Sequence, residues 1–264
     1  ETEVFVHGAL CMSVSGQCLL SSLNGGRSGN RGACAQPCRL PWTLDAAQKD
    51  PFPWLSPCDQ SLLDGIPDLT RIGVRSLKIE GRMRSADYVG QVVAVYREAL
   101  DRLQDNNPLN RQERDRARER LLLAFNRGGR FSDRPISGQM GRAFLAGSYS
   151  GSYGLLLGTV LKSDPVTGVL TIRSDKASNR TVTRGDVLSV RMSGEDKERA
   201  SAPVGKISQT SDGWRVQGFH PDVLRTITPG LQVYQMGSQE SRRAPGRSAR
   251  TSLDLSLSTE GELI

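Results

Sequence analysis

The sequence contains few of the residues from which common hydrolases build their active sites. It has only two histidines, His7 and His220. It contains neither a G-x-S-x-G nucleophile elbow nor an H-E-x-x-H metal motif. His220 precedes Pro221 within a Gly-rich region, which favours a loop position. A serine hydrolase or zinc peptidase of the common type therefore has no basis in this sequence.

Long hydrophobic runs and a secretory signal are also absent. No apolar run approaches the roughly 18 residues that a membrane-spanning helix needs. The five cysteines are odd in number, and a chain of this length can build a core without disulfides. We therefore expect a cytoplasmic protein with free thiols and no membrane association.

Composition and charge point to a folded protein with a basic surface. The chain has 264 residues, of which 37% are hydrophobic, and this predicts one large domain or two smaller ones. The net charge of +7 favours a polyanionic partner such as RNA. Many basic residues lie beside acids, as in Arg111–Arg116, so ordinary solvated surface charge is the alternative.

Cysteines are the densest chemical feature. Four of them lie within the first forty residues and the fifth follows, at Cys11, Cys18, Cys34, Cys38 and Cys58. Structural zinc usually draws on two short cysteine pairs, and only Cys34 and Cys38 are that close. An iron–sulfur cluster tolerates wider spacing, whereas buried, unreactive thiols are the plain alternative. Four cysteines in one Gly-rich loop favour a cluster or a metal.

The first half of the chain alternates between strand and helix patterns. We expect strands at 3–7 and 74–79, and helices at 59–72, 86–104 and about 111–125. This predicts an α/β domain over residues 1–135. In barrels of alternating strands and helices the carboxyl ends of the strands carry the chemistry, so His7 and Glu80 are expected to face one site.

The second half has a different character. Short apolar runs separated by Gly, Asp, Asn and Ser predict a small antiparallel β-barrel domain over 150–236. We expect strands near 153–160, 168–172, 186–191, 205–207, 214–219 and 231–235. Residues 237–264 are expected to form a basic linker and the start of a further segment.

Three stretches of the sequence resemble the motifs of a known family. E-x-F-x-H-G-A-L-C-M-S-x-S-G-Q-C-L-L-S-S at Glu3–Ser22, N-R-G-x-C-A-Q-P-C-R-L-P at Asn30–Pro41 and S-L-K-I-E-G-R-M at Ser76–Met83 are similar to peptidase family U32, the collagenase-like proteins. The resemblance implies the C-terminal part of a TIM-like (β/α) barrel followed by a β-barrel. A barrel cannot begin at its penultimate strands, so we expect the chain to be a fragment of a longer protein.

The resemblance also implies a cofactor and a reaction. Family members resembling this chain bind a [4Fe-4S] cluster and hydroxylate a cytidine in ribosomal RNA or a uridine in transfer RNA. The motif carries Cys11, Cys18 and Cys34 over as ligands. Cys58 is expected as the fourth, although it lies three residues before the usual position, and Cys38 is the alternative.

Roles for other residues follow from the same resemblance. His7, Lys78, Glu80 and Arg82 are expected to line the catalytic site. Arg27, Arg31 and Arg39 are expected to bind RNA phosphate or a small anionic co-substrate, since a planar guanidinium suits such groups. Two other functions stay open: a collagenase-like peptidase, with His7 acting on Cys11, and a non-catalytic binding fragment.

Overall fold

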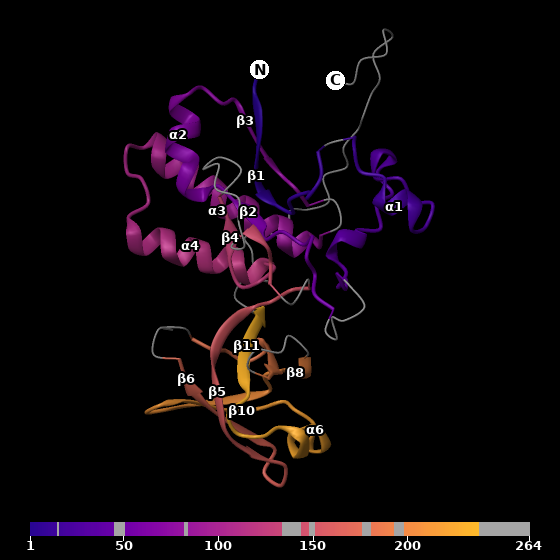
Figure 1. Ribbon diagram of the computed structural model, residues 1–264. Coiled ribbons are helices and arrows are strands. Elements are labelled where there is room, and N and C mark those ends of the chain that lie inside the picture. The colour runs from indigo at the N-terminus through magenta and orange to yellow at the C-terminus, as the bar shows by residue number, and fades with distance from the viewer. Residues whose placement is uncertain are drawn as a thin grey trace, which may run out of the picture.

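Figure 1 shows the protein as a computed structural model. The structure describes residues 1–14, 16–44, 51–81, 84–133, 144–147, 151–175, 181–192 and 198–237. Arg82, the 237–264 segment beyond Gly237, and the other residues between these ranges lie outside the description. Among the described residues, no helix combines the length and apolar character needed to cross a membrane.

The first half of the chain is a mixed α/β region. Its strands are β1 (Glu3–Gly8), β2 (Asp59–Ser61), β3 (Ser76–Ile79) and β4 (Phe131–Ser132). Its helices are α1 (Leu20–Leu23), α2 (Ile66–Arg71), α3 (Ala86–Gln104) and α4 (Arg111–Ala124), with short 3-10 turns η1 (Gly29–Arg31), η2 (Pro37–Arg39) and η3 (Leu63–Gly65).

The four strands form a mixed sheet in the order β3-β1-β2-β4. β1 is parallel to β3 and antiparallel to β2, while β2 is parallel to β4. The α/β character of the first half is therefore confirmed. That this sheet belongs to a larger (β/α) barrel stays a prediction.

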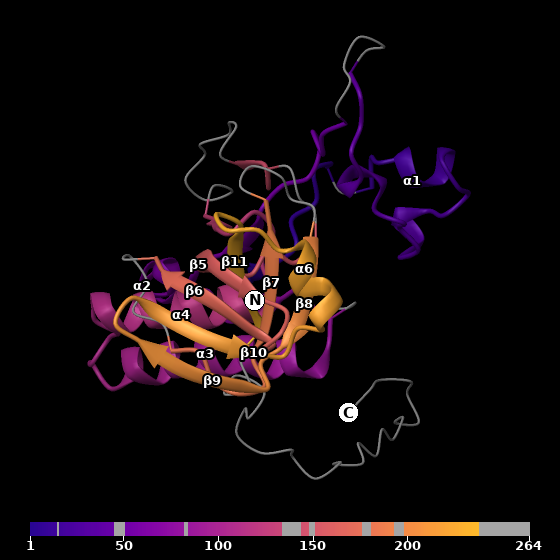
Figure 2. The ribbon, with the colours of Figure 1, turned by 90° about the horizontal axis from the view of Figure 1, so that it is seen from below.

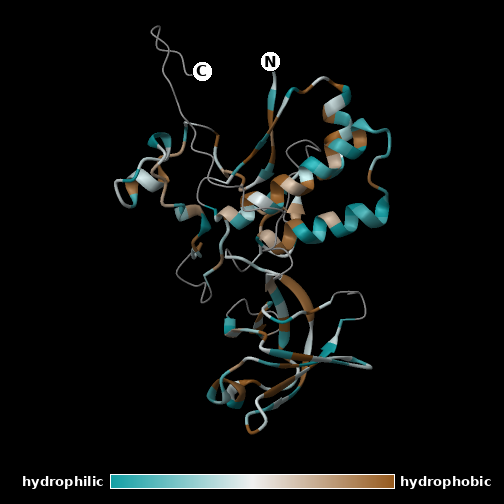
Figure 3. Cartoon of the chain, turned by 180° about the vertical axis from the view of Figure 1, so that it is seen from behind, coloured by the Kyte–Doolittle hydropathy of each residue, from teal (hydrophilic) through white to brown (hydrophobic). Residues whose placement is uncertain are grey.

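Helices α3 and α4 begin at side-chain caps. The Ser85 hydroxyl accepts a hydrogen bond from the Tyr88 amide, and Asn110 forms a capping box with Glu113. α3 buries one face against β1 and α2 through Val92, Val95 and neighbouring residues. Figure 3 shows α4 as hydrophilic along most of its length and hydrophobic near its C-terminal end. That end packs into the core.

The predicted helix at 59–72 is wrong over its first residues. Asp59–Ser61 form β2 instead, because Ser61 pairs with His7 and the Leu62 amide donates to the Val6 carbonyl. The helix proper starts at Ile66, with Pro67 in its first turn, where a missing N–H costs nothing. Pairing with a distant strand thus outweighs the local helical spacing.

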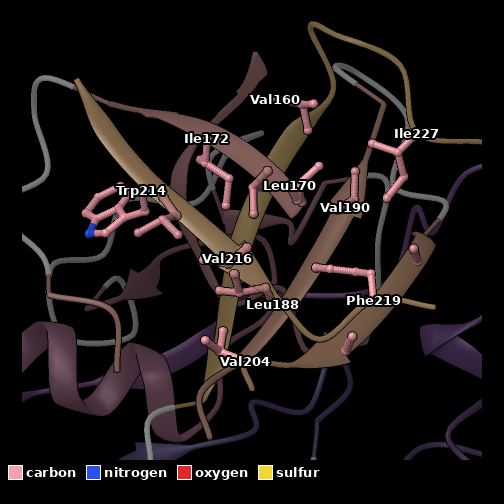
Figure 4. Packing of buried hydrophobic residues seen from close by; sticks show 14 of the residues in the cluster. Val160, Leu170, Ile172, Leu188, Val190, Val204, Trp214, Val216, Phe219 and Ile227 are labelled. Atoms are coloured by element: carbon pink, nitrogen blue, oxygen red, sulfur yellow. The ribbon is translucent and has the colours of Figure 1, made fainter. Parts of the chain in front are cut away.

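The second half is a curled antiparallel sheet in the order β8-β7-β11-β5-β6-β10-β9. Its strands are β5 (Leu155–Asp164), β6 (Val169–Ser174), β7 (Val187–Arg191), β8 (Glu198–Pro203), β9 (Lys206–Thr210), β10 (Gly213–Gln217) and β11 (Gln232–Gly237). Figure 4 shows side chains such as Leu170, Leu188 and Val216 packed together inside the curl. No pairing between β8 and β9 closes the ring within the described residues, so the predicted barrel is a half-barrel here.

Two elements of this half were not predicted from the sequence. β8 has the sequence E-R-A-S-A-P, which is poor in β-formers. α6 (Pro221–Thr226) starts at His220, whose side chain accepts a hydrogen bond from the Asp222 amide. His220 is therefore an exposed helix cap.

One buried asparagine connects the two halves. The Asn126 side chain donates to the Leu122 and Gly154 carbonyls, and the Tyr153 amide donates to the Asn126 carbonyl. α4 also contacts β5 and β11. Figures 1 and 2 both show the segment around α1 set apart from helices α2–α4. This segment carries four of the cysteines.

Candidate functional site

Four cysteines line one pocket of about 610 Å³ beside α1. They are Cys11, Cys18, Cys34 and Cys38. Cys11 and Cys34 are exposed, whereas Cys18 and Cys38 are half-buried. Burial raises the pKa of the Cys38 thiol; the Arg39 guanidinium acts in the opposite direction, and the other three sulfurs lie within electrostatic range. The structure thus gathers four thiols that are spread over 28 residues of sequence.

Hydrogen bonds within the loop hold this pocket open. The buried Ser21 hydroxyl accepts from the Ala35 amide at 2.9 Å, joining α1 to the segment with Cys34 and Cys38. The Asn30 amide group donates to the Gly16 carbonyl at 3.3 Å. Arg27 Nε donates to the Ala33 carbonyl at 2.9 Å. A loop nearly devoid of apolar residues is therefore ordered by its own polar groups.

Cys58 lies elsewhere. Its side chain is fully buried, and its Sγ donates to the Leu145 carbonyl at 3.3 Å. Its amide donates to the Phe144 carbonyl, so the segment after β4 covers it. Burial raises the pKa of the Cys58 thiol, against the effect of Arg130. Cys58 is not among the residues that line the cysteine pocket, and this geometry favours Cys38 as the fourth member of the set.

The spacing of the sulfurs bears on what the pocket can hold. Within the described ranges, no three His, Cys, Asp or Glu side chains lie close enough to bind one metal ion. A single zinc ion would need such a group. In an iron–sulfur cluster each thiolate binds a different iron, so the four cysteine sulfurs around a cluster are further apart than those around a single zinc ion. Four thiols that line one open pocket are a donor set that a [4Fe-4S] cluster could use, since each iron takes one thiolate.

His7 is buried in an aromatic cage away from solvent. Its side chain is 2% exposed, and its ring lies 5.1 Å from Phe131 and 5.6 Å from Tyr96, between ring centroids. Burial lowers the pKa of His7 to about 3, and the positive charge of Arg84 acts in the same direction. Nε2 has no hydrogen-bond partner among the described residues. His7 is thus a neutral imidazole, and it is not presented to the cysteine pocket.

A buried ion pair lies close to His7 along the sheet. Arg127 Nη1 is 2.5 Å from Asp59 Oδ1, and both side chains are less than 10% exposed. Burial raises the pKa of Asp59, while Arg127, Arg84 and Arg39 act in the opposite direction. The sequence interpretation missed this pair, because it assigned Asp59 to a helix, and the strand that buries it forms only by pairing with β1.

The second motif lies beside the first, as expected, but its side chains diverge. The Glu80 amide donates to the His7 carbonyl at 2.8 Å. Gly8 has a φ of +113°, and a Cβ there would come within 2.5 Å of the Glu80 carbonyl oxygen. Lys78, by contrast, is half-exposed and pairs with Glu3 at 3.0 Å. Arg82 lies outside the described residues.

The three arginines assigned to anion binding differ from one another. Arg27 and Arg31 are exposed on the cysteine loop. Arg39 is 8% exposed, and its guanidinium donates to Leu10, Ser56 and Pro57. Burial lowers the pKa of Arg39, with Arg127 acting in the same direction. Arg27 and Arg31 are therefore open to solvent, whereas Arg39 is enclosed by the protein.

The chain is similar to several known proteins over part of its length. It is 44% identical to "tRNA hydroxylation protein P1" of Bacillus subtilis over 114 residues, which are 38% of this chain and 26% of the relative. It is 46% identical to "23S rRNA 5-hydroxycytidine C2501 synthase" of Escherichia coli over 103 residues, 38% of this chain and 16% of the relative. It is 40% identical to a "Collagenase" of Porphyromonas gingivalis over 131 residues, 48% of this chain and 36% of the relative.

The matches cover only part of each relative, so the chain spans well under half of their lengths. No solved structure matches the chain. The model of the family described as "Peptidase family U32" matches residues 1–138, which include the cysteine loop, the buried His7 and the Asp59–Arg127 pair. This match covers more than half of the sequence, and the chain therefore belongs to peptidase family U32.

Proposed function

We propose that the protein containing this chain takes part in hydroxylating an RNA base in the cytoplasm, and that Cys11, Cys18, Cys34 and Cys38 hold a [4Fe-4S] cluster. The observation that carries the proposal is the convergence of these four cysteines on one pocket. Relatives named for tRNA and rRNA hydroxylation support the choice of reaction. The cluster would supply electron transfer, which is chemistry that protein side chains lack.

The chain's own residues would bind and position the RNA. Arg27 and Arg31 lie exposed on the loop that carries the cysteines, where guanidinium groups can bind phosphate oxygens. They are also suited to a small anionic co-substrate. The half-barrel is a second binding module in this proposal, as small β-barrels often are for nucleic acids. Phosphate contacts would fix the register of the RNA, and the pocket would select the base.

A peptidase is the second candidate, supported by the relatives named as collagenases. It would need His7 to activate a cysteine nucleophile. The imidazole is enclosed by Tyr88, Tyr96 and Phe131, whereas Cys11 is exposed and lines a pocket that does not include His7. This arrangement favours the hydroxylation proposal over the peptidase.

The test uses the full-length protein in cells that lack their own RNA hydroxylation proteins. We expect it to restore hydroxycytidine or hydroxyuridine, measured by mass spectrometry of digested ribosomal and transfer RNA. Cys34→Ser should abolish the signal, and Asp101→Asn, on the exposed face of α3, is the control. Unmodified RNA together with cleavage of gelatin that depends on His7 would favour the peptidase. The absence of both activities would favour a non-catalytic binding role.

A further inference from the structure

Arg39 is a buried arginine whose guanidinium joins three separate segments of the chain. Nη2 donates to the Leu10 carbonyl at 2.5 Å. Nη1 donates to the Ser56 hydroxyl at 3.1 Å and to the Pro57 carbonyl at 2.6 Å. Arg39 itself closes η2, directly after Cys38. One side chain thus ties the loop after β1 and the η2 turn to the segment before β2.

Two of these anchored segments carry pocket cysteines. Leu10 directly precedes Cys11, and Arg39 directly follows Cys38. Both cysteines line the pocket. The planar guanidinium presents several N–H groups in a fixed fork, so it can bridge the segments in one geometry, which a lysine ammonium cannot do. Arg39 therefore anchors the backbone beside two of the four cysteines.

The charge of Arg39 is also placed near the sulfurs. Cys38 and Cys11 lie within its electrostatic range. Asp59 also lies within electrostatic range of Arg39, but in the described part of the chain the ion pair that Asp59 forms is with Arg127. Four thiolates around a cluster carry excess negative charge, which a nearby cation stabilises more strongly where burial excludes water. Hydrogen bonds and charges behind the ligands also set the potential of a cluster.

We propose that Arg39 is a positioning residue for the cysteine pocket, which holds Cys11 and Cys38 in place and offsets the negative charge of the bound group. The inference rests on the proposed cluster. It assigns Arg39 to the pocket wall, in place of the RNA-binding role expected from the sequence.

Arg39→Gln and Arg39→Lys separate the two effects, with Arg71→Gln, at an exposed arginine on α2, as the control. The chain would be reconstituted without oxygen, and cluster loss to a chelator and the midpoint potential of the cluster would be measured. Arg39→Gln should lose the cluster roughly 10- to 100-fold faster, as is typical when outer partners of metal ligands are removed. The midpoint potential of the cluster should fall in this variant. The positive charge of Arg39 stabilises the reduced cluster, which is the more negative form, and the variant lacks that charge.

Arg39→Lys keeps the positive charge but loses the planar guanidinium that donates to Leu10, Ser56 and Pro57. It should lose the cluster faster than wild type, with a potential close to that of wild type, and Arg71→Gln should match wild type in both. Wild-type loss rates in both Arg39 variants would overturn the inference. If circular dichroism shows that Arg39→Gln does not fold, the rate of cluster loss in Arg39→Lys decides alone: a wild-type rate in that variant overturns the inference. A wild-type chain that takes up no cluster would contradict the proposed function itself.

Discussion

His7 is the residue whose surroundings most constrain its chemistry. The imidazole contacts Tyr88, Tyr96 and Phe131, and the Tyr96 hydroxyl lies 3.4 Å from Nδ1. A ring held in this way stays neutral at any pH near 7, because burial disfavours the imidazolium ion. We infer that His7 shapes the core where β1 meets α3.

The lowered pKa of His7 predicts a pH dependence of stability. The folded value of about 3 lies below the usual 6.5, so the unfolded chain binds the proton first. Stability should therefore fall as the pH drops from 6.5 towards 3, by about 1.4 kcal/mol per pH unit. His7→Phe fills the same space without the titration. Urea denaturation at pH 7 and pH 4.5 measures the loss of unfolding free energy between the two pH values. This loss should be about 2–3 kcal/mol smaller in His7→Phe than in wild type. Parallel pH profiles would contradict this account.

The Asp59–Arg127 pair makes a second prediction at this scale. Arg127→Met leaves a buried carboxylate without its closest cation, which typically costs about 3–5 kcal/mol. We expect the lower end of that range, since Arg84 and Arg39 also lie near Asp59. Denaturant unfolding of Arg127→Met, Asp59→Asn and the double variant measures the coupling. The double variant should be more stable than the sum of the two losses implies, and strict additivity would show that the pair is not coupled.

At the scale of elements, α4 depends on its first turn. Most residues of α4 are charged, and few of them pack into the core. The capping box therefore contributes much of the stability of the first turn of this helix. Asn110→Ala should lower the free energy of unfolding by about 1 kcal/mol. Glu113→Gln is the control, because glutamine can complete the box while the partly exposed ion pair with Arg102 is lost. The prediction fails if Glu113→Gln costs as much as Asn110→Ala in the same denaturation experiment.

Elements with strong local signals could be predicted from the sequence. α3 runs from Ala86 to Gln104 as expected, because Ser85 caps it and its apolar residues keep helical spacing. β2 could not be predicted, since only pairing with β1 makes a strand of Asp59–Ser61. The choice between Cys38 and Cys58 was equally out of reach. It depends on how an irregular loop folds, and spacing alone does not determine that.

The same contrast holds for the candidate site. The motifs pointed to His7 and to the cysteines, and the structure gathers four of the cysteines around one pocket and buries His7 in the core. The direction of each side chain depends on packing partners far away in the sequence, such as Tyr96 and Phe131 around His7. Burial of Arg39 likewise depends on acceptors at Leu10 and Pro57. Residue identity alone therefore could not separate a pocket-lining side chain from a core one.

At the scale of the molecule, the half-barrel has a core of its own. Its cluster of buried residues runs from Leu157 to Val233 and includes no residue of the α/β region. A fragment covering residues 151–237 should therefore fold alone, with a β-type circular dichroism spectrum and cooperative thermal unfolding. Val233→Asp in the fragment is the control and should abolish folding. An unfolded wild-type fragment would show that the α/β region is needed to complete this domain.

The proposed cluster belongs to the cysteine pocket. This proposal depends on single thiols, on the loop that brings them together and on the family to which the chain belongs. The most direct test measures iron and acid-labile sulfide in protein purified without oxygen, for wild type, Cys38→Ser and Cys58→Ser. We predict about four of each per wild-type chain, loss of the cluster in Cys38→Ser and its retention in Cys58→Ser. Iron that is lost with Cys58→Ser and kept with Cys38→Ser, or that is absent from wild type, would contradict the account.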